Sequence, residues 1–388
     1  MTGHEARLMK FLAEHEAQAL ALLERIVNID SGSYDKAGVD RVGEALADYL
    51  AGHNIQTRRE ALAEQGDAFV SELRDGANGA HVLLMGHRDT VFKEGEAARR
   101  PYHVAEGRAY GPGVADMKAG LVINAVVMAA FARLGLPHPP LVNLITGDEE
   151  IGTPGSRPAI EAAARGARVV FNAEPGRVSG NVVTGRRGGI FFKAQLTGRA
   201  AHAGLDYEYG RSAILSLARK IEAWTGITDK VADVTVNVGL VAGGLSVNTV
   251  APWASCEIDL RYGNPDDRDT LVARVLQVAA EESVADTTCE IAIAGEFLPM
   301  QPTAAQTRML ELYRGSAREA GLELDGEFTR SCADSGITAA LGVPTICATG
   351  PVGGRAHSEE EYLELGTFVP RMQALGVAIL RLAKEDAA

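Results

Sequence analysis

Histidines and acids follow three apolar runs of the sequence, at the points where the runs end. The run 81–85 leads into His87 and Asp89, the run 141–146 into Asp148, Glu149 and Glu150, and the run 168–173 into Glu174. Apolar runs of this length, bounded by turn residues, are typical of buried strands in a parallel sheet. Polar residues at the carboxyl ends of such strands lie where open α/β sheets bind ligands. We therefore expect these side chains to share one edge of a sheet.

Two histidines and several carboxylates make a ligand set for divalent metal ions. Imidazole and carboxylate groups suit zinc, with manganese or cobalt as substitutes. Five ligands, one of them shared, would serve two ions, and the candidates are His87, Asp116, Glu150, Glu174 and His357. Asp89, two residues after His87, is expected to accept the N–H of the far ring nitrogen and so fix the tautomer of that imidazole.

Each of these residues, taken alone, has a plain structural explanation. Three adjacent acids at 148–150 are compatible with a solvated turn in which water screens their repulsion. Asp116 would serve equally as the cap of a helix that begins at Met117, and Glu174 precedes a proline, as turn residues often do. The recurrence of such residues at successive strand ends is hard to attribute to chance, and it favours the metal site.

Alternating strands and helices have to position these residues. Apolar residues at helical spacing predict helices over 8–29, 39–50, 117–133 and 304–321 and from about residue 368, and apolar runs predict strands over 81–85, 141–146, 168–173 and 343–348. This alternation predicts an α/β domain with a mostly parallel sheet flanked by helices and a site along one edge.

The pattern changes after about residue 185. Strands are expected over 189–196, 231–241, 254–262 and 288–293, and helices over 211–224 and 265–282. The order βαββαβ is the ferredoxin-like arrangement of an antiparallel sheet with two helices on one face. We therefore expect a catalytic α/β domain formed by residues 1–185 and 298–388, and an α+β domain inserted at 186–297.

The composition argues against several partners. The net charge of −13 over 388 residues argues against nucleic acid, which calls for a basic face. The apolar stretch 119–136 is interrupted by Asn124 and Arg133, so it predicts a buried helix and no membrane span. Charged residues from 4 to 16 argue against a secretory signal. The four cysteines lack metal-site spacing and are expected in the core of a cytoplasmic protein.

Six segments resemble the signature segments of the dinuclear-zinc aminoacylase/carboxypeptidase family. They are Gly86-His-Arg-Asp-Thr-Val, Gly111-Pro-Gly-Val-Ala-Asp-Met-Lys-Ala-Gly, Asp148-Glu-Glu, Ala173-Glu-Pro, Gly198-Arg-Ala-Ala-His-Ala-Gly and Ala356-His-Ser. They occur in the family's order over nearly the whole chain, including the inserted domain. Within the family, the sequence resembles the glutamate carboxypeptidase (carboxypeptidase G) group in particular.

The resemblance implies a role for each matching residue. Asp116 would bridge two metal ions, His87 and Glu174 would complete one site, Glu150 and His357 would complete the other, and Glu149 would be the general base. His202 would reach the active site of a partner subunit across a homodimer formed by the inserted domain. Asn248 and Arg261 would hold the carbonyl and carboxylate ends of the substrate, and Gly354 would be a further substrate-binding position. An ion pair within its own strand is the alternative for Arg261.

The implied activity is hydrolysis of an amide whose amine portion carries a free carboxylate, such as a C-terminal glutamate. A water molecule held between two cations loses its proton near neutral pH. Glu149 can accept that proton and pass it to the leaving nitrogen, which is typically worth ~10² to 10⁴ in rate. The oxyanion could be stabilised by a metal ion and His202.

Other activities are compatible with the same residues. They are a deacylase of N-acyl amino acids, an aminohydrolase acting on an aromatic or ureido substrate, and a metal-binding protein without catalysis; Glu149 argues against the last. Arg186, Arg187, Ser212 and the segment 331–335 depart from the pattern of the glutamate carboxypeptidase group. These departures leave the acyl group and the side chain of the substrate open.

Overall fold

The computed structural model describes residues 1–74 and 79–385, and the chain divides into two compact units. Unit 1 comprises Met1–Gly185, Met300–Thr329 and Ala333–Ala388, and unit 2 comprises Arg186–Pro299 and Arg330–Cys332. The expected boundary at residue 297 differs from the observed one, and the short segment 330–332 was expected in the catalytic domain. It belongs to unit 2 because Arg186 and Arg261 both hydrogen-bond to Cys332.

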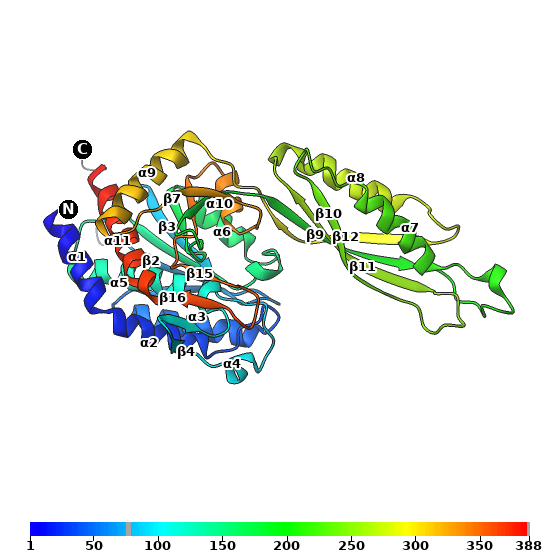
Figure 1. The fold of residues 1–388 in the computed structure, drawn as a ribbon, viewed down its shortest axis with the longest axis horizontal. Helices are drawn as coiled ribbons and strands as arrows, with labels where there is room; N and C mark the ends of the chain where they lie inside the picture. Colours follow the sequence, from blue (N-terminus) through cyan, green and yellow to red (C-terminus); the bar gives the residue numbers. More distant parts are fainter. Residues whose placement is uncertain (75–78, 386–388) are drawn as a thin grey trace. The chain divides into compact units, whose positions relative to one another are not determined.

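Unit 1 is built on an eight-stranded mixed sheet (Figure 1). In spatial order the strands are β1 (Thr57–Glu60), β2 (Ala68–Leu73), β6 (Leu141–Thr146), β3 (His81–His87), β7 (Ala167–Asn172), β14 (Thr345–Cys347), β8 (Val182–Arg186) and β13 (Gly326–Thr329). The four central strands from β6 to β14 pair in parallel, as expected. Strands β1, β2 and β8 pair antiparallel at the sides of the sheet, and the sequence pattern did not predict them.

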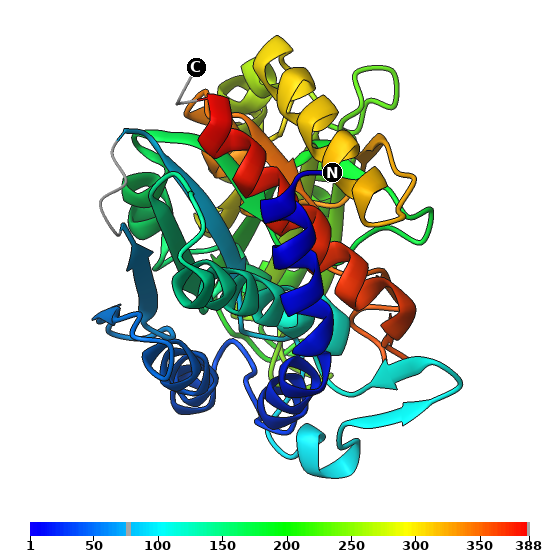
Figure 2. The same cartoon turned by 90° about the vertical axis from the view of Figure 1, so that its left-hand side faces the viewer.

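The central strands are covered by helices on both faces. Val82 and Leu84 of β3 join a core with α1 (Gly3–Glu14), α2 (Glu16–Val27), α3 (Lys36–Ala51), α5 (Ala119–Leu134), α9 (Ala304–Glu319) and α11 (Phe368–Glu385). Leu83 and Met85 join a second core with α6 (Arg157–Ala164) and α10 (Ser335–Ala340). Successive side chains of a strand point to opposite faces of the sheet, so a strand buried on both faces contributes alternate residues to the two cores. Figure 2 shows α1 running beside α11, so the helices nearest the two termini pack together.

The helix α5 is the central helix of the first core. The segment Val114–Leu134 is long and apolar enough to cross a membrane, but 94% of its most apolar window is buried inside the protein. This burial confirms the prediction of a core helix for the apolar stretch 119–136.

A small antiparallel sheet and several short turns complete unit 1. The sheet consists of β15 (Gly353–Gly354), β16 (Tyr362–Glu364), β5 (Arg108–Tyr110) and β4 (His103–Ala105). Short helical segments lie at Glu96–Arg99 (α4), Glu149–Ile151 and Leu365–Thr367. None of these was expected from hydrophobic periodicity, because each is too short to show one.

Unit 2 has the expected βαββαβ order. It consists of β9 (Gly188–Thr197), α7 (Ala213–Thr225), β10 (Thr235–Gly243), β11 (Trp253–Tyr262), α8 (Arg268–Ala280) and β12 (Thr288–Phe297), with short turns of helix at Tyr207–Tyr209 and Pro265–Asp267. The sheet order is β10-β11-β9-β12, antiparallel throughout. Leu217 and Trp224 of α7 are buried against the sheet, whereas Ile214 of the same helix is 47% exposed. Ser212 caps α7 by accepting the Leu215 N–H at 3.1 Å.

Candidate metal centre

Three strand ends and one distorted turn bring the predicted ligands together. His87 is the last residue of β3 and Glu174 follows β7 by two residues. Asp116 lies in a turn at Val114–Lys118, in which Asp116 and Met117 have non-helical backbone angles, so α5 begins at Ala119 and not at Met117. Gly120 packs against the carbonyl oxygen of Ala173 so closely that a Cβ there would overlap it. This contact brings the start of α5 next to the strand end that carries Glu174.

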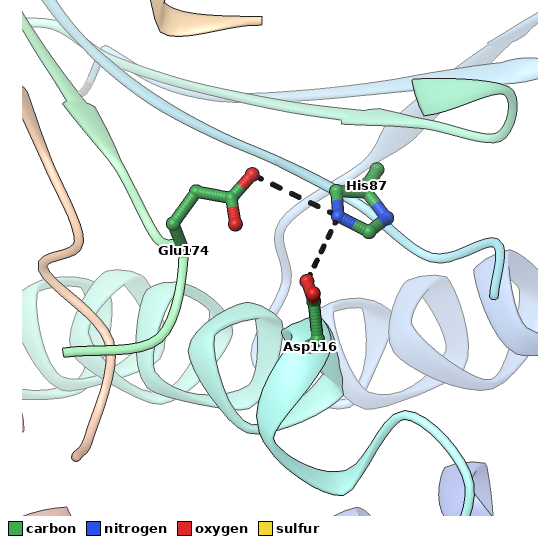
Figure 3. Close-up of side chains that lie close together, drawn as sticks. All are labelled: His87, Asp116 and Glu174. Carbon is green, nitrogen blue, oxygen red and sulfur yellow. Dashed lines mark ion pairs between the residues drawn. The ribbon is translucent and has the colours of Figure 1, made fainter. Parts of the chain in front are cut away.

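The first cluster consists of His87, Asp116 and Glu174 (Figure 3). His87 Nε2 lies 3.3 Å from Asp116 Oδ1 and 3.8 Å from Glu174 Oε1. The second cluster consists of Asp116, Glu150 and His357, in which His357 Nε2 lies 3.3 Å from Asp116 Oδ2 and 3.1 Å from Glu150 Oε2. Within each cluster one atom of every residue lies within 4.8 Å of the others. Asp116 therefore turns one carboxylate oxygen toward each cluster.

Glu149 lies beside the first cluster. Its Oε2 is 3.8 Å from His87 Nε2, and the residue is 7% exposed. Glu149 and Glu150 occupy a short helical turn, and Glu150 belongs to the second cluster. These adjacent residues thus have different neighbours, although both come from the three acids that follow β6.

Asp89 has more partners than the one predicted for it. His87 Nδ1 lies 3.1 Å from the Asp89 backbone carbonyl oxygen and 3.4 Å from the carboxylate, so the backbone oxygen makes the hydrogen bond. The Asp89 carboxylate accepts hydrogen bonds from Ser33 Oγ at 2.8 Å and from the N–H groups of Glu149 and Glu150, each at 3.1 Å. Asp89 therefore fixes the turn that carries the two glutamates, because its carboxylate is fully buried beneath that turn.

Glu361 is a further residue of the site that sequence reasoning missed. Its fully buried carboxylate accepts hydrogen bonds from the N–H groups of Gly113, Ala115 and Asp116 at 2.9 to 3.1 Å. These bonds hold the turn that presents Asp116. In the sequence, Glu361 ends a run of three glutamates after His357-Ser358, and nothing in that run distinguishes the buried acid from its exposed neighbours.

Burial and mutual repulsion govern the charges of the acids. Burial raises the pKa of Glu149 well above its ordinary value; His87 opposes this effect and Glu174 adds to it. Burial raises the pKa of Glu150 to about 7, although a hydrogen bond with His357 lowers it. Hydrogen bonds with Asp116 and Glu150 raise the pKa of His357 to about 10. Within the chain, imidazolium groups thus supply the counter-charge for these acids.

The donor set fits divalent metal ions. Asp116 Oδ1 is buried without a hydrogen-bond partner among the described residues, as expected of an oxygen that serves as a metal ligand. Each cluster offers one imidazole nitrogen and carboxylate oxygens, the combination that zinc accepts. A cation in each cluster would also replace the protons that the imidazoles carry.

The residues expected to bind substrate in unit 2 have local partners. His202 is exposed, and its Nδ1 accepts the N–H groups of Gly204 and Leu205, each at 3.2 Å. The Ala203 N–H donates to the Asn248 carbonyl oxygen at 2.9 Å, so the segments that carry His202 and Asn248 lie side by side. These two hydrogen bonds stabilise the turn that carries His202. With Nδ1 accepting, the proton of a neutral imidazole is on Nε2.

Arg261 is half-buried and paired inside unit 2. Its Nε donates to Asp259 Oδ1 at 2.6 Å, its Nη1 lies 2.6 Å from Cys332 Sγ, and its guanidinium lies over the ring of Phe191. The alternative of an ion pair within its strand is therefore present in the structure. In unit 1, Gly354 lies in β15, and a Cβ there would overlap the ring of Tyr362.

Comparison with known proteins identifies relatives over the whole chain. Residues 83–381 match the model of "Peptidase family M20/M25/M40". Carboxypeptidase G2 of a Pseudomonas species is 26% identical over 97% of this chain and 92% of its own length, and the succinyl-diaminopimelate desuccinylase of Methylobacterium radiotolerans is 29% identical over 87% and 86%.

A solved structure shares the fold. It is a dinuclear metal-binding peptidase of the M20 family from Bacillus subtilis, which superposes with a TM-score of 0.66 at 12% identity and covers 96% of this chain and 99% of its own. The fold matches the prediction of an α/β domain with an inserted α+β domain. The family model covers more than half of the chain, so the protein belongs to peptidase family M20/M25/M40 and is a metallopeptidase or related amidohydrolase.

Proposed function

We propose that the protein hydrolyses an amide bond whose amine portion carries a free carboxylate, releasing a C-terminal glutamate or a related amino acid. The observation that carries the proposal is the pair of ligand clusters that share Asp116, with the buried carboxylate of Glu149 beside them. The ligands of the first ion would be His87, Asp116 and Glu174, and those of the second Asp116, Glu150 and His357. We propose zinc as the metal, because imidazole nitrogen with carboxylate oxygen suits it.

Glu149 performs the proton transfers in this proposal. Two bound divalent ions would acidify a water molecule and polarise the carbonyl group of the substrate. Glu149 accepts a proton from the attacking water and then donates it to the leaving nitrogen. Its buried position supports this role, because burial raises the pKa of a carboxyl group toward the working pH of a general base.

The inserted unit supplies the proposed substrate-binding groups. Arg261 would hold the free carboxylate of the amine portion, and Asn248 and His202 would donate to the carbonyl oxygen. The Nε2–H of His202 is left for such a donation because Nδ1 accepts from the backbone. Gly354 would lie against the substrate in unit 1.

The same geometry serves the deacylase reaction, and the desuccinylase relative favours it as the second candidate. The test is turnover of N-benzoyl-glutamate, N-acetyl-ornithine and N-succinyl-diaminopimelate by the zinc-loaded protein, followed through the released amine. We expect the glutamate conjugate to have the highest kcat/KM. A clear preference for either of the other two would favour the deacylase, and no amide turnover by a fully loaded protein would contradict both.

We also propose a homodimer through the inserted unit. Strand β10 lies at an edge of its sheet, and it and the following turn expose Leu240, Val241, Leu245 and Val247. Exposed sheet edges with apolar side chains tend to be paired with another chain. His202 of one chain would then complete the site of the other.

All four cysteines are free, which supports a cytoplasmic location.

Mixing two inactive variants tests the role of His202 across the dimer. If His202→Ala and Glu149→Ala chains exchange subunits, each mixed dimer contains one site with neither change, so activity returns toward half of the wild-type value per mixed dimer. Absence of recovery, with exchange verified by mass spectrometry, would assign His202 to its own chain.

A further inference from the structure

A hollow of about 430 Å³ lies in unit 1 beside the second metal-ligand cluster. Its volume falls within the range of ~300–1,000 Å³ that is typical of small-molecule sites. Its wall consists of the segments 32–35 and 90–94 together with Glu150 and Ile151. Glu150 belongs to the second cluster, so a molecule held at that cluster has direct access to the hollow. We call this hollow the Tyr34 pocket.

The two segments of the wall are joined to each other and to the metal site. The Ser33 N–H donates to the Thr90 carbonyl oxygen at 3.1 Å, and Gly32 pairs with Thr90 in a parallel bridge. A Cβ on Gly32 would overlap the Phe92 carbonyl oxygen, so the segments approach closely. Ser33 Oγ donates to the same Asp89 carboxylate that holds the turn of the two glutamates. The pocket is therefore formed before a ligand binds, which lowers the entropic cost of binding.

The pocket presents apolar side chains that the core does not cover. Tyr34 and Val91 line it and are 83% and 44% exposed, and Ile151 is half-buried. Tyr34 has no hydrogen bond or ring contact among the described residues. The Phe92 ring is held by Arg100, whose guanidinium lies 4.8 Å from the ring centroid. Such side chains favour an apolar group that covers them, and aromatic rings add a preference for a second ring.

The charges around the pocket oppose an anionic group. Asp35, Glu94 and Glu150 line it, and Lys93 is the one cation among the lining residues. Even with Glu150 bound to a metal ion, two carboxylates accompany one ammonium group. A carboxylate that entered the pocket would be repelled by these acids, and such repulsion selects against a ligand. The amine portion of the proposed substrate carries a carboxylate, so the pocket suits the acyl portion better.

We propose that the Tyr34 pocket binds the acyl portion of the substrate and selects acyl portions that are apolar and uncharged. The proposal rests on the proposed function, in which Arg261 holds the carboxylate of the amine portion. The scissile carbonyl group would lie at the metal ions, so its acyl substituent would be near the ligand Glu150 and could enter the pocket. A benzoyl group would cover Tyr34, whereas a succinyl group would bring its carboxylate toward Glu94.

Substrates that share glutamate as the amine portion test the acyl preference. We expect the wild-type kcat/KM for N-benzoyl-glutamate to exceed that for N-acetyl-glutamate at least ~10-fold, because a single methylene in an apolar pocket is worth ~10- to 200-fold. Tyr34→Ala should lower this ratio at least ~5-fold, since contacts between aromatic rings contribute about that much beyond the area they bury. A loss of turnover that is equal for both substrates would contradict the proposal.

Phe328→Ala is the matched control. Phe328 is an aromatic residue of β13 in unit 1 that is 51% exposed and does not line the pocket, so its replacement should leave the ratio unchanged. The amine portion is the alternative occupant. If Tyr34→Ala instead lowered the preference for N-acetyl-phenylalanine over N-acetyl-alanine and left the benzoyl ratio unchanged, the pocket would belong to the amine portion and the proposal would be wrong.

A charge reversal tests the exclusion of anionic acyl portions. The wild-type protein should favour N-butanoyl-glutamate over N-succinyl-glutamate, and Glu94→Lys should reduce this preference at least ~5-fold, because a charge close to a carboxylate is worth about that much even in water. Glu64→Lys is the control, since Glu64 is an exposed acid of unit 1 outside the pocket, without a hydrogen bond or ion pair in the described part of the chain. Equal effects of the two reversals would mean that overall charge sets the preference and that the pocket does not.

Binding of the free acids keeps the proposal separate from the proposed function. We expect benzoate to bind the metal-loaded wild-type protein at least ~10-fold more tightly than acetate in calorimetry, and Tyr34→Ala to remove most of this difference. If no amide is hydrolysed but benzoate still distinguishes wild type from Tyr34→Ala, the proposed function fails and the apolar site stands. Equal benzoate affinities in the two proteins would overturn the site, whatever the activity.

Discussion

His87 and Arg88 are adjacent in the chain but contact different groups of buried carboxylates. The charges of these groups are neutralised in different ways. The carboxylates of Asp40 and Asp67 form one group, the Asp40–Asp67 cluster. Arg88 pairs with Asp40, and Arg59 and Lys36 each pair with both carboxylates. Permanent cations thus neutralise the Asp40–Asp67 cluster.

His87, one residue earlier, belongs to the metal-ligand clusters. Among the described residues, the ion-pair partners of Asp116 and Glu150 in the metal-ligand clusters are imidazoles, which carry charge only while they hold a proton.

The pKa values of the two clusters express this difference. Burial raises the pKa of Asp67, but hydrogen bonds from Lys36, the Leu62 N–H and Arg59 outweigh burial and hold it at about 2. For Glu150 burial prevails and the pKa lies at about 7. Permanent cations therefore stabilise the Asp40–Asp67 cluster over the whole physiological pH range, whereas the metal-ligand clusters are suited to bind and release cations or protons.

The largest expected effect separates Glu149 and Glu150, the two adjacent glutamates of the metal site. Glu149→Gln should lower kcat by ~10² to 10⁴, the usual size of a lost general base, and keep the metal content near the wild-type value. Glu150→Gln should lose metal instead. Steady-state kinetics together with elemental analysis of dialysed protein check both outcomes, and exchanged phenotypes would mean that the roles of the two glutamates are reversed.

Removal of metal should destabilise the protein through the metal-ligand clusters and leave the Asp40–Asp67 cluster unaffected. Binding at a free ion concentration of about 1,000 times Kd stabilises the folded state by about 4 kcal/mol. We expect a chelator to lower the Tm of the wild-type protein markedly, and elemental analysis to give two ions per chain after reconstitution. An Asp116→Asn variant should show little further loss with the chelator, and one ion per chain in a saturated, active wild-type protein would rule out the shared carboxylate.

Asp89→Asn should weaken metal binding by ~10- to 100-fold, the typical cost of changing a residue that orients ligands. The amide would keep the shape of Asp89 but could not accept all three hydrogen bonds from Ser33, Glu149 and Glu150. Competition with a chromogenic chelator measures the change. Asp229→Asn is the control, because Asp229 also accepts two backbone N–H groups but lies in unit 2. Equal losses in both variants would contradict a specific role for Asp89.

The smallest expected effect concerns the Asp40–Asp67 cluster. Because the pKa of Asp67 is lowered by folding, its contribution to stability is fully present above about pH 4 and is lost as the pH falls through about 2. Asp67→Asn should lower the free energy of unfolding by about 1–2 kcal/mol at pH 7, allowing for the partial exposure of Lys36 and Arg59. Urea unfolding at a series of pH values checks this, and a deficit that persisted at pH 2 would contradict the ion-pair explanation.

The candidate ligands could be predicted because their signals are local. A histidine or an acid directly after an apolar run is visible in a short window, and parallel strands bring such ends to one edge. This reasoning identified His87, Glu150 and Glu174, which the structure places in the two clusters. It did not predict β1 or the small sheet around β16, because strands of two to four residues carry too little periodicity to be recognised. It also missed β2, in which Ser71 and Glu72 interrupt the apolar run.

The sequence by itself determined the α/β and βαββαβ order of the elements and the types of side chain available to a metal ion. Only the tertiary structure decided which charges meet. Glu361 holds the turn of Asp116 from 245 residues away, Arg88 and His87 enter different clusters, and the segment 330–332 joins the arginines of unit 2. Side-chain type and periodicity are properties of short segments, whereas the neutralisation of a buried charge depends on every segment packed around it.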